Sequence, residues 1–229
     1  MAEHPAEAAE ITSHSQALAL NLGNITDARM ESMPKSLEIA SRLHIPVMLD
    51  LVGTACSNLR YEFAQKLMSI HMPKLLKGNM SELLAMSGQT AHAIGIDAGT
   101  QDVLTNDNRS RLKDLFQKKA AQWNTTLLIT GKEDMVISAN ECAFITNGTS
   151  SMSQITGTGC MLGMICATYL AVADPFTAAL SAATEFGIAG EKAEKNSSGP
   201  GSFQIELFDQ FYKLTEQDIN SSQKVLFAK

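Results

Sequence analysis

Short apolar runs of strand length alternate with longer segments of helical period along the first 130 residues of the chain. Each run is followed by a small or polar residue, and a helical pattern follows each of the first three. This alternation is typical of stacked βα units, which build a largely parallel sheet covered by helices. It predicts strands at 17–22, 46–52, 74–77 and 126–130, and helices at 27–43, 59–70 and 81–86.

Polar residues precede these three helices and can cap their first turns. Thr26, Asn58 and Asn79 are the candidate N-cap residues, because their side chains can accept hydrogen bonds from the unpaired amides of the first turn. Pro34 lies inside the first helical pattern and is expected to kink it.

The pattern changes after residue 130. Residues 135–138 and 142–146 flank an Ala-Asn-Glu turn, which predicts an antiparallel hairpin added to the sheet. Residues 88–105 are rich in Gly, Asp and Thr and have little periodicity, so an irregular surface loop is expected there. The last part of the chain predicts helices that cover the sheet, at 160–173, 175–195 and 203–214. We therefore expect one α/β domain spanning residues 1–229.

Charge and cysteine content narrow the class of function. The 18 basic and 24 acidic residues give a net charge of −6, and no basic run could neutralise a series of phosphates, so nucleic-acid binding is not expected. The four cysteines lack metal-ligand spacing, which favours a reduced, cytoplasmic setting. No apolar run approaches the roughly 20 residues that cross a bilayer.

A glycine-rich turn, Ile-Thr-Gly-Thr-Gly-Cys at 155–160, leads directly into an apolar helix. Glycines let backbone N–H groups converge without Cβ obstruction, and the helix start adds unpaired donors and the positive end of the helix dipole. This geometry suits a phosphate, although glycine before a helix is also common where nothing binds. No Walker A run occurs, and the glycines are misspaced for a dinucleotide fingerprint. The predicted anion hole comprises Gly157, Thr158, Gly159 and Cys160.

Four side chains near the expected site carry two interpretations each. Asp50 ends one predicted strand and Glu82 follows another, so both could hold Mg²⁺ through water at the carboxyl edge of the sheet. Equally, Asp50 could cap a turn, and Glu82 could be a solvated acid in the first turn of a helix. Lys77 could meet phosphate oxygens or be a solvated lysine. Cys160 could act as a base at the helix start or be a small buried hydrophobe.

Together, these residues resemble the hydroxyethylthiazole kinase family of thiamine salvage, which has a ribokinase-like fold. The resemblance runs along nearly the whole chain, through residues 20–23, 45–50, 77–82, 129–134, 155–160 and 199–207. It implies a three-layer α/β architecture with a mostly parallel central sheet flanked by helices and a small antiparallel hairpin. It also implies ATP-dependent phosphorylation of the primary alcohol of 4-methyl-5-(2-hydroxyethyl)thiazole, with Mg²⁺ required, in a homotrimer whose sites lie between subunits.

The resemblance also implies roles for individual residues. The magnesium and phosphate region would contain Asp50 and Glu82, and Cys160 would stand where the wider ribokinase-like group has an Asp base. Phosphoryl transfer through a loose transition state depends mainly on positioning and charge neutralisation, so it tolerates that change. The remaining implied contacts are Lys77, Thr130 and Gly131 with ATP, and Met1 and Gly157 with the thiazole.

Two departures from the family pattern leave alternatives open. The chain reads Asp-Leu-Val-Gly at 50–53 where the family usually has Asp-Pro-Val-Gly, so this loop is expected to be less rigid. Met1 aligns with an internal methionine of the family, so the chain is expected to be N-terminally short relative to it. A catalytically silent nucleotide-binding fragment, or a kinase for another small alcohol such as hydroxymethylpyrimidine, are the alternatives. Hydrate dehydratases of this fold carry Gly-Asp in place of Gly159-Cys160, which argues against that class.

Overall fold

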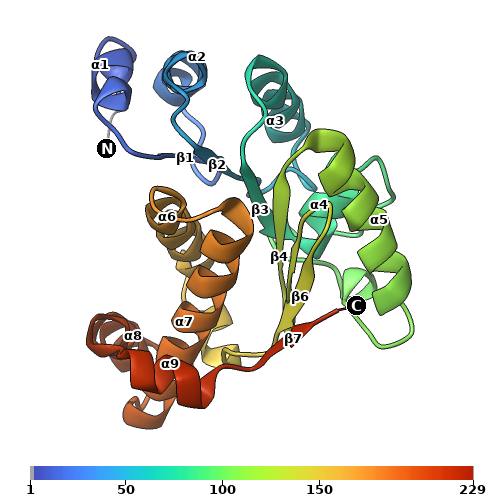
Figure 1. The fold of residues 1–229 in the computed structure, drawn as a ribbon, viewed down its shortest axis with the longest axis vertical. Helices are drawn as coiled ribbons and strands as arrows, with labels where there is room; N and C mark the ends of the chain where they lie inside the picture. Colours follow the sequence, from blue (N-terminus) through green and yellow to red (C-terminus); the bar gives the residue numbers. More distant parts are fainter. Residues whose placement is uncertain (1–2, 229) are drawn as a thin grey trace.

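A seven-stranded sheet forms the centre of the protein, and its strands lie side by side in the order of the sequence (Figure 1). The computed structural model describes residues 3–228. The first four strands pair in parallel and the last three in antiparallel fashion. The strands are β1 (Leu18–Asn21), β2 (Val47–Asp50), β3 (Leu75–Asn79), β4 (Thr126–Thr130), β5 (Asp134–Ile137), β6 (Cys142–Ile145) and β7 (Val225–Phe227).

Helices cover both faces of the sheet and make a three-layer molecule (Figure 1). One face carries α2 (Asp27–Leu43), α3 (Asn58–Ile70), α4 (Met80–Met86) and α5 (Arg109–Trp123). The other carries α6 (Thr158–Leu170), α7 (Pro175–Asn196) and α8 (Pro200–Lys213), while α1 (Ala8–Ser13) packs on α2 and α9 (Glu216–Ser222) on α7. The predicted fold class, with its mostly parallel sheet and antiparallel hairpin, is confirmed.

The central strands are continuous apolar runs in the sequence because both of their faces are buried. Val47 and Leu49 of β2 pack into the core under α2 and α3, whereas Met48 between them packs into the core under α6 and α7. A strand buried on both faces has no polar side to alternate with. Asp50 closes this strand and is itself fully buried, so its burial needs a polar partner.

Among the α-helices and strands of residues 3–228, four were not predicted: α1, α5, α9 and β7. Helix α5 buries Leu112, Phe116 and Ala120 and packs Leu115 and Trp123 against the same core, so its apolar residues recur at helical spacing and the helix was missed although the sequence carries its signal. Strand β7 has three residues and pairs with β6 at the far edge of the sheet. In the segment predicted as an irregular loop, the structure has one isolated bridge between Ile94 and Asp97 and a 3-10 turn at Thr100–Asp102.

The helix caps were predicted correctly at two of three positions. Thr26 accepts from the Arg29 amide, and Asn79 accepts from the Glu82 amide. At α3 the prediction was wrong by one residue, since Ser57 is the cap and Asn58 is the first helical residue. Helix α2 runs as one element with Pro34 inside it. Within residues 3–228, every helix is too short or too polar to span a membrane.

Candidate functional site

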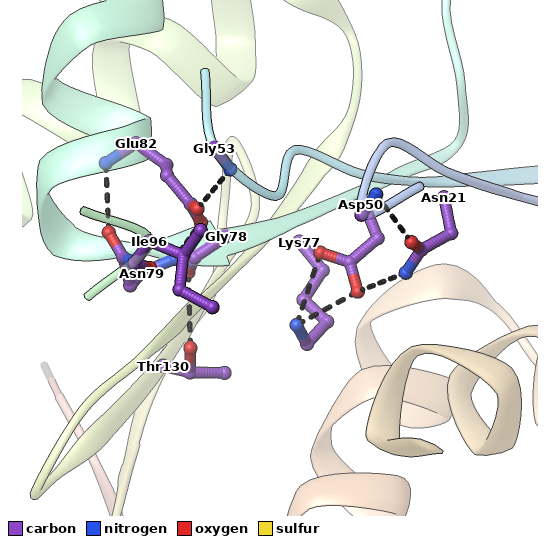
Figure 2. A network of polar contacts seen from close by, with 10 residues as sticks. Asn21, Asp50, Gly53, Lys77, Gly78, Asn79, Glu82, Ile96 and Thr130 are labelled. Atoms are coloured by element: carbon purple, nitrogen blue, oxygen red, sulfur yellow. Dashed lines mark hydrogen bonds and ion pairs between the residues drawn. The ribbon is translucent and has the colours of Figure 1, made fainter. Parts of the chain in front are cut away.

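Polar side chains meet at the carboxyl ends of β1, β2 and β3. Lys77 Nζ lies 3.2 Å from Asp50 Oδ1 and 3.1 Å from Asp50 Oδ2, and Asn21 Nδ2 donates to the latter oxygen at 3.0 Å (Figure 2). The Lys77 and Asp50 side chains are 4% and 0% exposed. Since parallel strands end at the same edge of a sheet, three polar residues separated widely in sequence form one buried network.

Burial and pairing act against each other in this network. Burial raises the pKa of the Asp50 carboxyl, and Lys77 and Asn21 act to lower it. Burial also opposes the charge of Lys77, but Asp50, with its charge and its hydrogen bond, outweighs that effect and raises the pKa of the lysine. The two-oxygen contact is that of an ion pair, so Lys77 presents a fixed positive charge at the edge of the sheet.

Glu82 lies on the other side of Lys77 from Asp50 (Figure 2). Its Oε1 accepts from the Gly53 amide and its Oε2 from the Asn79 amide, both at 2.7 Å, so one carboxylate joins the loop after β2 to the end of β3. The Asn79–Glu82 pair forms a capping box at the start of α4. Burial, the largest effect, raises the pKa of Glu82 to about 7 even though both amides and Lys77 lower it.

The glycine-rich turn meets this network on the face of the sheet that α6 covers. Gly157 is the N-cap of α6 with φ +101°, a conformation that favours glycine, and no atom lies within 4 Å of where its Cβ would be. The first helical hydrogen bond runs from the Met161 amide to the Gly157 carbonyl. The amides of residues 158–160 therefore precede the helical ladder, and the Thr158 amide makes only a 3.4 Å bond to Ile155.

The glycines of α6 allow it to approach the ion pair closely. A Cβ on Gly159 would lie 3.6 Å from Lys77 Nζ, and one on Gly163 would lie 3.0 Å from Asp50 Oδ2. The helix start, its positive dipole end and the Lys77 ammonium thus converge on one place. An anion there would meet backbone donors on one side and a fixed cation on the other.

Cys160 faces the loop that follows β1. A Cβ on Gly23 would lie 3.6 Å from Cys160 Sγ, and the thiol is partly exposed. Cys166 lies two turns further along α6 in the core, where burial raises its thiol pKa to about 12. Of the two cysteines in α6, only Cys160 is placed to meet a ligand.

The predicted nucleotide contacts Thr130 and Gly131 lie at the end of β4 and in the turn that follows it. Thr130 Oγ1 donates to the Gly78 carbonyl at 3.4 Å, and the Gly131 amide donates to Asp134 Oδ1 at 2.8 Å. Burial raises the pKa of Asp134 to about 7 against the lowering effects of Gly131 and Lys77. Thr130 therefore lies beside the strand that carries Lys77, with its partly exposed side chain at the same edge.

Comparison with known proteins identifies the family. The model of the hydroxyethylthiazole kinase family matches residues 1–217. The chain is 38% identical over 219 residues to hydroxyethylthiazole kinase 2 of Clostridium botulinum strain Hall, covering 96% of this chain and 82% of that one. The protein belongs to the hydroxyethylthiazole kinase family.

Solved structures agree with this assignment. The hydroxyethylthiazole kinase protein of Pyrococcus horikoshii OT3 superposes with a TM-score of 0.88 at 30% identity, covering 100% of this chain and 84% of that one. A ribokinase-like superfamily protein from Enterococcus faecalis V583 superposes with a TM-score of 0.59 at 16% identity, over 90% of this chain and 66% of that one, which shows the shared fold.

Family membership does not by itself assign the site residues. The structure brings the glycine turn, Lys77 and Asp50 together and leaves Glu82 on the far side of Lys77, engaged with backbone amides. The predicted thiazole contact Met1 lies outside the described residues. Within the described part of this hydroxyethylthiazole kinase family member, no three His, Cys, Asp or Glu residues cluster as metal ligands.

Two residues at this edge of the sheet, one in the network and one beside it, were not singled out from the sequence. Asn21 ends an apolar strand, the same signal that drew attention to Asp50, and could have been found by it. Arg60 lies in the first turn of α3 yet bonds to carbonyls 37 and 38 residues away, and nothing in the local pattern indicates that.

Proposed function

We propose that the protein transfers the γ-phosphoryl group of ATP to the primary alcohol of 4-methyl-5-(2-hydroxyethyl)thiazole, as one kinase domain. The observation that supports this is the start of α6, with its glycine turn, seated against the buried Lys77–Asp50 pair in a member of this family. A migrating phosphoryl group needs positioned donors and neutralised charge more than a strong base, and this arrangement supplies both.

In the proposed reaction, the alcohol oxygen forms a bond to the γ-phosphorus while the bond from that phosphorus to the bridging oxygen of ADP breaks. The amides of residues 157–160 and the Lys77 ammonium stabilise the charge on the equatorial oxygens. Cys160, acting as the thiolate, accepts the alcohol proton on Sγ and becomes the thiol, and Gly157, without a side chain, leaves room for the thiazole alcohol. Thr130 and Gly131 contact the nucleotide from the β4–β5 turn.

Magnesium fits the donor set as a hydrated ion. Asp50 Oδ2 accepts from both Lys77 and Asn21, whereas Asp50 Oδ1 and each oxygen of Glu82 accept one of these hydrogen bonds and have a second lone pair for a metal-bound water. Mg²⁺ retains waters readily and takes phosphate oxygens as ligands, so Asp50 and Glu82 would hold it through water. The ion would neutralise part of the phosphate charge.

We also propose that the protein is a cytoplasmic homotrimer with its active sites at the subunit interfaces.

The test is turnover of hydroxyethylthiazole with ATP and Mg²⁺, followed by phosphorus NMR of the thiazole phosphate. Hydroxymethylpyrimidine serves as the competing acceptor, and calorimetry measures ATP binding. ATP binding without turnover of either alcohol would make the protein a silent nucleotide-binding module, and preference for the pyrimidine would overturn the substrate assignment.

A second experiment tests the thiol. Cys160→Ala is expected to lower kcat without abolishing it, since positioning dominates this chemistry. The control is Cys56→Ser, which changes the exposed cysteine of the β2–α3 loop and keeps a hydrogen-bond donor. An unchanged kcat in Cys160→Ala would remove the thiol from the mechanism.

A further inference from the structure

Arg60 reaches from the first turn of α3 to the loop after β1. Its Nε donates to the Leu22 carbonyl at 2.9 Å and its Nη2 to the Gly23 carbonyl at 3.3 Å. A guanidinium is a planar fork of donors, so it can bind two successive carbonyls at once, which a lysine ammonium does less well. Arg60 therefore fixes two consecutive peptide groups of this loop.

The same guanidinium packs on the loop after β2. A Cβ on Gly53 would lie 2.9 Å from Arg60 Cδ and 3.0 Å from Arg60 Nη1, and Gly53 has φ +78°. The Gly53 amide in turn donates to Glu82 Oε1. Through this contact Arg60 joins the β1 loop to the loop that Glu82 holds beside β3.

The β1 loop is the segment that faces the thiol. The Gly23 amide donates to Asn21 Oδ1 at 2.7 Å, and Asn21 Nδ2 donates to Asp50. With Arg60 on its carbonyl, Gly23 is held on both of its peptide groups. It lies close enough to α6 that a Cβ there would be 3.6 Å from Cys160 Sγ.

We propose that Arg60 is a positioning residue for the acceptor alcohol. It holds residues 22 and 23 against Cys160 and so fixes the side of the site beside which the alcohol must lie. The nucleotide groups at Lys77 and Thr130 are held by other contacts. The predicted effect on the KM for the alcohol rests on the proposed function. The predicted effect on how well the β1 loop covers the Cys160 thiol does not depend on any substrate.

The experiment compares Arg60→Met and Arg60→Lys with the parent protein. Arg60→Met removes both carbonyl contacts with little loss of side-chain length, and Lys66→Met is the matched control because Lys66 is exposed on the same helix. We expect the KM for hydroxyethylthiazole to rise about tenfold in Arg60→Met, equivalent to ~1.4 kcal/mol, with the KM for ATP within about twofold. Arg60→Lys should restore part of the loss.

A second readout uses no substrate. The rate of iodoacetamide alkylation at Cys160, followed by peptide mass spectrometry, should rise in Arg60→Met and stay at the parent value in Lys66→Met. If the parent protein does not phosphorylate hydroxyethylthiazole, the proposed function fails while this readout still tests the inference. Should Arg60→Met not fold, Arg60→Lys alone decides, with a smaller rise in both quantities expected.

Two results would overturn the inference. One is an equal rise of the KM values for ATP and for the alcohol, which is the behaviour of a residue that supports the whole site. The other is a Cys160 alkylation rate in both Arg60 variants that equals the parent rate.

Discussion

Removing one member of the Lys77–Asp50 pair should cost far more stability than removing both. The two side chains are 4% and 0% exposed, so Lys77→Met leaves a buried carboxylate that keeps the hydrogen bond from Asn21 but loses its countercharge. Breaking a buried ion pair in this way costs ~3–5 kcal/mol, whereas replacing both charges by neutral groups is often close to neutral. We expect Lys77→Met to lose about 3–5 kcal/mol and the double variant Asp50→Asn, Lys77→Met to regain at least ~2 kcal/mol of it.

Urea unfolding at pH 7.5, followed by circular dichroism, measures these free energies. The matched control is Lys35→Met, which removes the exposed i,i+4 pair of Lys35 with Glu31, whose side chains are 45% and 62% exposed. Its expected cost is below ~0.5 kcal/mol. The reasoning is refuted if Lys77→Met costs less than ~1 kcal/mol. It is also refuted if the loss of unfolding free energy in the double variant equals the sum of the losses in Lys77→Met and Asp50→Asn.

Three further perturbations test other parts of the site. Burial raises the folded-state pKa of Asp134 to about 7 from 3.8, so the folded protein binds this proton more tightly than the unfolded chain and loses stability as pH rises between those values. The free energy of unfolding of Asp134→Asn minus that of the parent should therefore be larger at pH 8 than at pH 5. An equal difference at the two pH values would contradict this. Gly157→Ala, at φ +101°, should cost ~1–2 kcal/mol by thermal unfolding, while Gly199→Ala, in extended backbone with open space around it, should cost less than ~0.5 kcal/mol. Asn79→Ala should lower the free energy of unfolding by ~1 kcal/mol, because it loses the cap of α4. It should also speed proteolysis near Ile96, whose carbonyl accepts from Asn79. Unchanged cleavage would show that this contact does not hold the loop at Ile96.

The strands of the parallel half were predictable because their burial on both faces leaves a local signature. Residues 47–49 are apolar without interruption, and a run of that length between helical patterns has few other interpretations. Helix α5 was missed for another reason: its apolar residues recur at helical spacing, but they stand among many charged residues directly after a segment without periodicity.

The candidate site was predictable in outline for a different reason. Asp50 and Glu82 could be placed at one edge because every parallel strand ends there, and the turn at 155–160 could be recognised by its glycines before an apolar helix. Neither argument says which polar groups bind each other. The family resemblance implied the site residues but assigned no role to Asn21 or Arg60.

By itself, the sequence determined the order of the elements, the family and the edge of the sheet where polar residues collect, because periodicity, turn residues and motif spacing are properties of neighbouring residues. Tertiary structure alone decided that Lys77 pairs with Asp50, that Glu82 binds the Gly53 and Asn79 amides, and that Arg60 holds the loop beside Cys160. Such contacts depend on strand register and on how closely α6 approaches the sheet. Residues as far as 38 positions apart acquire these distances only when the core has packed.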